Sequence, residues 1–152
     1  AFFKLASTVL TDNKSGLKNH AIVFIDLDGF KSINDTYGHL FGDLALVTIS
    51  NVVNQIASQN NGLAFRYGGE EFVVLCGDTP LQNAQFLAEK LRTAIESSVL
   101  IKQRQVTCSF GVAEMVPGED PKNLFERADK ALYASKEGGR NRVTSAAFRG
   151  GS

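Results

Sequence analysis

The chain has 152 residues, no net formal charge at pH 7 and 43% hydrophobic residues. This length and composition suit one globular domain with a substantial core, and the zero net charge argues against nucleic acid as a partner. No apolar run approaches the roughly 20 residues of a membrane helix, so we predict no direct membrane insertion. Cys76 and Cys108 lie in strand-like apolar runs without the spacing of a zinc site, which favours reduced core thiols.

Helical and strand-like patterns alternate along the chain. The predicted helices cover residues 2–9, 30–37, 45–56, 84–95 and 124–132, and the predicted strands cover 21–25, 64–65, 72–76, 106–113 and 141–144. The run at 21–25 is β-branched and aromatic, which is typical of a strand buried on both faces. Residues 11–18 read as a loop, and residues 38–42 as a link after a helix that Gly38 closes. We therefore expect an α/β (α+β) fold, with a mixed sheet and helices on both faces. It would form one domain over residues 1–147, with a flexible tail at 148–152.

The stretch at 66–72 (RYGGEEF) places two adjacent carboxylates, Glu70 and Glu71, on a turn with Gly68 and Gly69. Apolar residues on both sides predict a β-hairpin around this turn. The glycines would let backbone N–H groups approach a ligand, and the carboxylates could hold a divalent cation. Taken alone, the same pattern would also suit an ordinary solvated turn.

Two further carboxylates, Asp26 and Asp28, flank the end of the strand at 21–25, where α/β proteins place ligand sites. Each of them could instead cap a helix or lie in a solvated loop. The helix that follows offers N–H groups for a phosphate at its start, and Asn34 could pair with a purine edge. Asp43 is an acceptor that would suit the N1–H and amine of guanine, or would cap the helix that it opens.

Five motifs occur in order along nearly the whole chain. They are DLDGFKSIND at 26–35, GHLFGD at 38–43, GGEEF at 68–72, SFGVA at 109–113, and ADKALY at 128–133 with 136 and 139–141. Together they resemble the motifs of the GGDEF family of bacterial diguanylate cyclases. The resemblance implies a sheet like that of nucleotide cyclases and polymerase palms, with the hairpin tip beside the end of the first strand.

The activity implied by the resemblance is the condensation of two GTP molecules into cyclic di-GMP, with release of two pyrophosphates. Each domain would bind one GTP, so a second copy of the domain would be required. Asp26 and Glu70, with the Leu27 carbonyl, would hold two Mg²⁺ ions, or Mn²⁺ as an alternative. Glu71 would support the metal site, and Glu70 would also accept the proton of the ribose 3′-hydroxyl.

The substrate contacts also follow from the resemblance. Asn34 and Asp43 would read guanine, and Gly68 and Gly69 would line the substrate site.

The β- and γ-phosphates would contact Phe30, Lys31, Lys136 and Arg140. The spacing of Lys136 and Arg140 suits one side of the last helix, if that helix continues so far. Without the resemblance, this pair would read as a basic helix end favoured by the helix dipole.

The chain departs from the family at two places. Many members carry an Arg-x-x-Asp product-inhibition motif before the hairpin, whereas Gln59 and Gly62 stand at its charged positions here. We therefore expect feedback inhibition by that route to be absent or weak. The segment that normally precedes residue 1 is missing, and it would connect to an upstream sensor or signalling domain. We expect a location in the bacterial cytoplasm, with a parent protein that could be anchored in the membrane through its missing part.

Two other functions compete with a GTP-condensing cyclase. One is a catalytically inactive domain that binds GTP or a protein partner, and the intact motif at 68–72 argues against it. The other is an adenylyl or mixed-product cyclase, which Asp43 disfavours, because relatives that accept ATP often carry a smaller hydroxyl residue there.

Overall fold

The computed structural model describes residues 20–98 and 100–146. The helices in this part are α2 (Phe30–Tyr37), α3 (His39–Gln59), α4 (Leu81–Ser98) and α5 (Pro121–Glu137). The strands are β1 (Ala21–Leu27), β2 (Gly62–Arg66), β3 (Glu71–Cys76), β4 (Leu100–Ile101), β5 (Arg104–Gln105), β6 (Cys108–Glu114) and β7 (Val143–Ser145). The predictions for residues 2–9, 11–18 and 148–152 lie outside the described residues.

Five strands form one mixed sheet in the order β2-β3-β1-β6-β7. β1 pairs antiparallel with both β3 and β6, and β7 runs parallel to β6 at the edge. Neighbours on both sides and helices on both faces leave every residue of β1 buried. The predicted mixed sheet, with the run at 21–25 in its interior, is confirmed.

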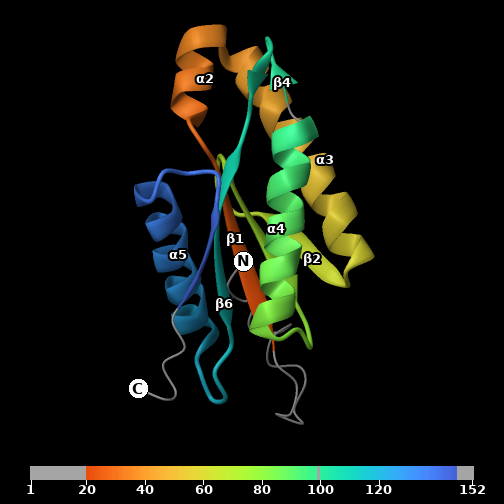
Figure 1. The fold of residues 1–152 in the computed structure, drawn as a ribbon, viewed down its shortest axis with the longest axis vertical. Helices are drawn as coiled ribbons and strands as arrows, with labels where there is room; N and C mark the ends of the chain where they lie inside the picture. The colour runs from red at the N-terminus through yellow and green to blue at the C-terminus, as the bar shows by residue number, and fades with distance from the viewer. Residues whose placement is uncertain (1–19, 99, 147–152) are drawn as a thin grey trace.

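Side chains alternate along β1 between two apolar layers. Val23, Ile25 and Leu27 pack with residues of α3 and α4, whereas Ile22 and Phe24 pack with residues of α5. Figure 1 shows this layering, with α5 on one side of the sheet and α3 and α4 on the other. Any side chain that continues the Ile22 and Phe24 series therefore lies on the α5 face.

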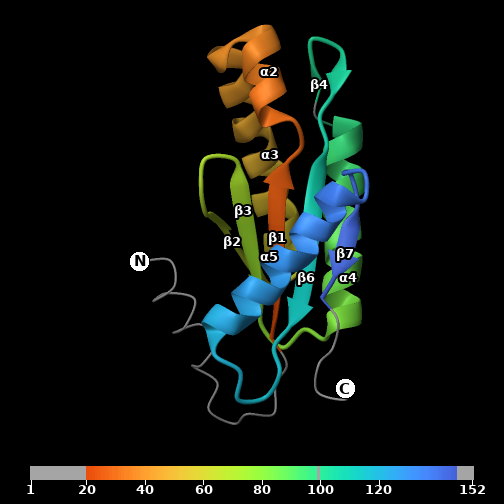
Figure 2. The same cartoon turned by 90° about the vertical axis from the view of Figure 1, so that its left-hand side faces the viewer.

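The end of β1 points toward a group of elements that project beyond the sheet. Figure 2 shows α2, the start of α3 and the short β4–β5 hairpin together at this end. Gly38 separates α2 from α3 with a φ of 93°, a conformation that residues with a Cβ rarely adopt. The chain can thus leave β1, form α2, and turn directly into α3.

The structure corrects the predicted elements at three places. The link expected at 38–42 is helical from His39 onward, because Gly38 alone makes the turn. The strand expected at 106–113 begins only at Cys108, because residues 106–107 form a non-strand link after the β4–β5 hairpin, which ends at Gln105. That hairpin was not predicted, because strands of two residues carry no periodic signal.

α3 is long and apolar enough to cross a membrane by length and composition alone. Its buried residues pack against the sheet as in the core helix of a folded domain, so this property is weak evidence for a membrane span.

Candidate active site

The carboxylates predicted to hold a metal meet at the end of β1. Asp26 lies directly opposite Glu71 in the β1–β3 register, and both continue the series of side chains on the α5 face. The backbone N–H of Leu27 donates to the carbonyl of Glu70 over 3.2 Å, which ties the hairpin turn to the strand end. The structure thus brings together the predicted metal-binding residues from two separate motifs.

A close helix–sheet contact brings a lysine to the same place. A Cβ at Gly111 would lie 2.1 Å from the carbonyl oxygen of Ala128, so only glycine allows α5 to pack this closely on β6. Two helical turns beyond Ala128, Lys136 forms an ion pair with Oδ2 of Asp26. Lys136, predicted to bind phosphate, here neutralises a predicted metal ligand.

Burial and mutual repulsion shape the electrostatics of these carboxylates. Burial raises the pKa of Asp26 above its ordinary value, and the charges of Asp28 and Asp129 raise it further, against the opposing effect of Lys136. Burial also raises the pKa of Glu70 and Glu71, and in both cases the charge of Asp26 adds to the effect. The site therefore concentrates negative charge that a cation would stabilise.

The donor set fits a divalent cation. Oδ1 of Asp26 is buried and has no hydrogen-bond partner in the described part of the chain. A bound metal cation would supply the partner that this oxygen lacks. Within residues 20–98 and 100–146, no three histidine, cysteine or carboxylate side chains converge into a ready metal cage. Mg²⁺ rarely needs one, because it commonly uses one or two carboxylates together with substrate phosphates and waters.

The hairpin turn is held from both sides. Nε of Arg66 donates to the carbonyls of Gly68 and Gly69 at 3.3 and 3.2 Å. The ring of Tyr67 packs against both Phe24 and Phe125.

The two glycines of the turn serve different purposes. A Cβ at Gly68 would lie 2.8 Å from Oε1 of Glu71, so this glycine makes room for the carboxylate. A Cβ at Gly69 would meet nothing within 4 Å, so this residue faces open space where a ligand could approach.

The predicted guanine readers lie where α2 meets α3. Oδ1 of Asn34 is buried without a hydrogen-bond partner among the described residues, and a Cβ at Gly42 would lie 1.8 Å from it. Gly42 thus creates the space that the Asn34 amide occupies. Asp43 is exposed beside it, inside α3 rather than at its start. The alternative role of Asp43 as a helix cap is wrong, because the cap position belongs to Gly38.

The first turn of α2 carries two of the predicted phosphate contacts. Lys31 is exposed, and Phe30 is half-buried against the core below. The cap residue, Gly29, has no side chain that could accept a hydrogen bond from the helix, which leaves the first N–H groups of α2 available to an anion.

Arg140 does not lie on the last helix. α5 ends at Glu137, so the expectation that Lys136 and Arg140 share one side of a continuing helix is wrong. Gly139, Arg140 and Asn141 follow with φ values of 122°, 66° and 45°, and this left-handed run turns the chain back toward β1.

Asp28 holds this loop in place. Its carboxylate accepts hydrogen bonds from Thr107 Oγ1 at 2.8 Å, Ser109 Oγ at 2.6 Å and the Asn141 backbone N–H at 3.0 Å. The two alternative roles of Asp28, a helix cap and a solvated loop charge, are therefore wrong. It joins the end of β1 to β6 and to the loop after α5.

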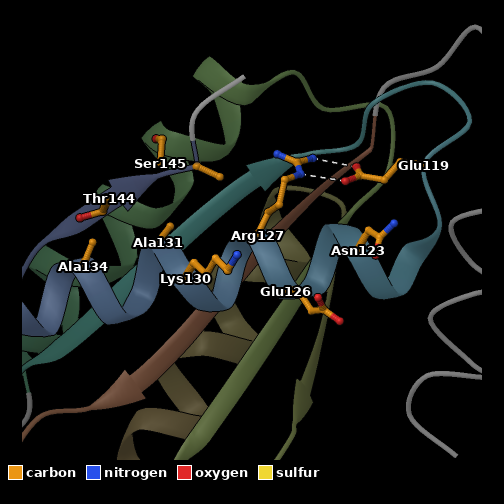
Figure 3. Close-up of a pocket in the computed structure, with 10 residues that line it drawn as sticks. Glu119, Asn123, Glu126, Arg127, Lys130, Ala131, Ala134, Thr144 and Ser145 are labelled. Atoms are coloured by element: carbon orange, nitrogen blue, oxygen red, sulfur yellow. Dashed lines mark hydrogen bonds and ion pairs between the residues drawn. The ribbon is translucent and has the colours of Figure 1, made fainter. Parts of the chain in front are cut away.

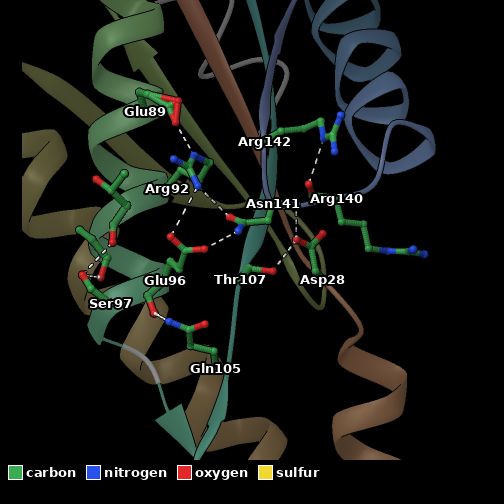
Figure 4. A network of polar contacts seen from close by, with 12 residues as sticks. Asp28, Glu89, Arg92, Glu96, Ser97, Gln105, Thr107, Arg140, Asn141 and Arg142 are labelled. Atoms are coloured by element: carbon green, nitrogen blue, oxygen red, sulfur yellow. Dashed lines mark hydrogen bonds and ion pairs between the residues drawn. The ribbon is translucent and has the colours of Figure 1, made fainter.

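The side chain of Asn141 extends the same network to α4. Its Oδ1 accepts a hydrogen bond from Arg92 Nη1 at 3.1 Å, and its Nδ2 donates to Oε2 of Glu96 at 2.5 Å (Figure 4). Sequence reasoning assigned no role to Asn141, Arg92 or Glu96. The sequence signal that could have indicated the role of Asn141 is its residue type, because asparagine tolerates the left-handed backbone found at this position.

A cavity of about 500 Å³ between α5 and β7 is not the candidate site. Among the described residues that line it, none is a predicted site residue. Arg127, which lines this cavity, donates to both oxygens of Glu119 (Figure 3). Arg127 also donates to the carbonyl of Glu114.

The window of the degenerate inhibition motif adjoins another cavity. This cavity of about 400 Å³ includes Gln59, at the end of α3, and the described residues that line it include no Lys or Arg. Gly62 opens β2 and packs closely on Val74.

Comparisons with known proteins agree with this geometry. The family model described as "Diguanylate cyclase, GGDEF domain" matches residues 1–142. Diguanylate cyclase A of Treponema denticola is 42% identical over 149 residues, and the match covers 94% of this chain and 40% of the relative. Diguanylate cyclase DgcM of Escherichia coli K12 is 41% identical, over 85% of this chain and 31% of the relative. The chain thus spans less than half the length of these two curated relatives.

Solved structures show the same fold. The GGDEF domain of DgcB from Caulobacter crescentus, solved with its coiled coil and cyclic di-GMP, has a TM-score of 0.89 and 34% identity. That match covers 96% of this chain and 79% of the DgcB chain. The active GGEEF domain of a diguanylate cyclase from Vibrio cholerae has a TM-score of 0.89 and 28% identity, over 97% of this chain and 95% of that one. The chain described here belongs to the GGDEF domain family of diguanylate cyclases.

Proposed function

We propose that this chain is the catalytic domain of a diguanylate cyclase that condenses two GTP molecules into cyclic di-GMP. The reaction would take place where two copies of the domain face each other, each with one GTP. The observation that carries the proposal is the convergence of Asp26, Glu70 and Glu71 at one strand end, with a buried carboxylate oxygen that lacks a partner. The family membership of the chain supports the same reaction class.

The bonds that change are the same in both halves of the reaction. The 3′-oxygen of each GTP would bond to the α-phosphorus of the other, and the bond from that phosphorus to the β-phosphate bridge would break. Each half releases one pyrophosphate, and the proton of each 3′-hydroxyl passes to a base. A carboxylate with a raised pKa is suited to accept that proton, and we assign this role to Glu70.

Asp26, Glu70 and the Leu27 carbonyl would hold two Mg²⁺ ions, with Glu71 in support. The bound ions would acidify the 3′-hydroxyl and offset charge on the α-phosphate and the departing pyrophosphate. Occupation of the free Asp26 oxygen would compete with the ion pair to Lys136. Lys136 would then be released toward the phosphates.

The remaining residues would bind and orient the substrate. Asn34 and Asp43 would pair with the guanine edge, because a half-buried amide beside an exposed carboxylate offers both a donor and acceptors. Phe30, Lys31 and Arg140 would contact the β- and γ-phosphates. We further propose that the domain works in the bacterial cytoplasm, where GTP is available, under the control of a signalling domain of a longer protein. The greater length of its two curated relatives supports this proposal.

The direct test uses the chain fused to a coiled coil that brings two copies together. With GTP and Mg²⁺ it should release pyrophosphate and form cyclic di-GMP, which chromatography identifies. Glu70→Gln should abolish both products, because the amide neither holds the cation nor accepts the proton. Glu126→Gln makes the same chemical change at an exposed position on α5, away from the site, and should leave the rate unchanged. Nucleotide binding without any product in the fused chain would instead identify an inactive GTP-binding domain.

A further inference from the structure

A second cavity adjoins the candidate active site on the side of the β4–β5 hairpin. Its volume is about 350 Å³, and it lies between the end of β1, this hairpin and the loop after α5. The lining residues are Asp28, Gly29, Arg104, Gln105, Thr107, Gly139, Arg140 and Asn141. Gly29 follows Asp26 by three residues, so the two backbones are at most about 11 Å apart.

Two arginines from separate elements line this cavity. Nη1 of Arg104 donates to Ser32 Oγ at 3.2 Å, and its Nη2 lies 3.1 Å from the position that a Cβ on Gly29 would take. The hydrogen bond to Ser32 holds the Arg104 guanidinium against the first turn of α2. No hydrogen bond engages the guanidinium of Arg140 within residues 20–98 and 100–146. Neither arginine forms an ion pair with a described carboxylate.

Asp28, the one carboxylate among the described residues that line the cavity, does not compete with an anion for these arginines. Both oxygens of Asp28 already accept hydrogen bonds, from Thr107, Ser109 and Asn141. The cavity therefore presents two guanidinium groups without an ion pair next to the candidate metal-binding strand end. Guanidinium groups bind phosphate oxygens in pairs of parallel hydrogen bonds.

We propose that Arg104 is a further substrate-binding residue, which contacts the terminal phosphate of GTP from the side opposite Arg140. The inference rests on the proposed function, because that function supplies the GTP. Arg104 lies outside the five motifs that mark the family in this chain, and only the β4–β5 hairpin brings it to α2. Contact between Arg104 and the terminal phosphate makes binding at the site depend on the number of phosphates in the nucleotide.

Calorimetric titration of the chain in Mg²⁺ tests this role. The ligands are GDP, GMP and 3′-deoxy-GTP, which lacks the attacking hydroxyl and so forms no product. Arg104→Gln should weaken the binding of 3′-deoxy-GTP tenfold or more, with GDP and GMP changed less than about twofold. Such a selective loss is expected because only the triphosphate reaches both arginines. The affinity of Arg104→Lys for 3′-deoxy-GTP should lie between those of the unaltered chain and of Arg104→Gln, since lysine keeps the charge and loses the planar fork.

Lys102→Gln is the matched control. Lys102 carries the same charge on the same hairpin, but its ammonium lies 4.9 Å from the centre of the Phe41 ring and not in the cavity. This variant should bind all three nucleotides as the unaltered chain does.

Two results would overturn the role of Arg104 alone. One is unchanged binding of 3′-deoxy-GTP by Arg104→Gln, and the other is an equal loss for all three nucleotides, which marks a structural effect. Unchanged GMP affinity also reports that the variant is folded. If the unaltered chain binds none of the nucleotides, the proposed function fails together with this inference, so the two failures are distinguishable.

Discussion

The side chain of Asn141 should stabilise the domain and keep Arg140 in the site. Replacement by alanine removes the hydrogen bonds to Arg92 and Glu96 and leaves the backbone bond to Asp28 in place. It also forces a residue with a Cβ but no local hydrogen bonds into a φ of 45°.

The size of the effect follows from these two losses. Hydrogen bonds to charged groups contribute about 1.5–3 kcal/mol when well shielded. Arg92 and Glu96 are partly exposed and still form an ion pair without the amide, so we take about 1.5 kcal/mol for both bonds together. The left-handed backbone adds about 1 kcal/mol for alanine. A loss of roughly 2–3 kcal/mol should lower Tm by about 5–10 °C in a domain of this size.

Asn141→Gly separates the two contributions. Glycine adopts the left-handed conformation freely, so this variant should lose mainly the hydrogen bonds and melt above Asn141→Ala. Thermal unfolding followed by circular dichroism gives both values, and titration with 3′-deoxy-GTP reports whether Arg140 is still in place. If both variants melt within about 1 °C of the unaltered chain, the network does not hold the loop.

Further predictions concern the candidate active site and the cavity beside Gln59. Asp43→Ala should reduce the preference for GTP over ATP in binding about tenfold or more, because guanine loses a charged acceptor; an unchanged ratio would refute the base contact. Folding raises the pKa of Asp26, Glu70 and Glu71. Between the ordinary and the raised pKa values, the folded chain therefore binds more protons than the unfolded chain. Without metal, its free energy of unfolding should fall as the pH rises from about 4 through these raised pKa values. Stabilisation by Mg²⁺ should grow over the same range, since the ion needs ionised ligands, and a Tm shift by Mg²⁺ that is independent of pH would contradict this. Cyclic di-GMP should not bind tightly beside Gln59, because no Lys or Arg to face its phosphates is among the described residues that line the adjoining cavity. Micromolar binding that survives excess GTP and is lost in Gln59→Ala would overturn this.

Several elements could be predicted from the sequence because their signals are local. The continuous apolar run at 21–25 predicted the buried strand, and the glycine turn between apolar runs predicted the β2–β3 hairpin. Gly38 likewise predicted the end of α2. Each of these features depends on the conformational preferences of a few neighbouring residues, which the chain carries wherever it folds.

The roles of Lys136, Arg140 and Asp28 could not be predicted in the same way. Whether Arg140 lay on a helix depended on where α5 ends, and helix ends are set by packing as much as by local sequence. The contact of Asp28 with Ser109 depends on the pairing of β1 with β6, which no local pattern encodes.

By itself, the sequence determined the elements, the order of the motifs and the kinds of chemical group available to the site. Only the tertiary structure decided which groups meet. Lys136 reaches Asp26 across 110 residues because Gly111 admits α5 close to β6, and Arg104 reaches Ser32 because the β4–β5 hairpin lies beside α2. Such contacts follow from sheet order, register and helix packing, which come from the burial of the whole core and not from any single segment.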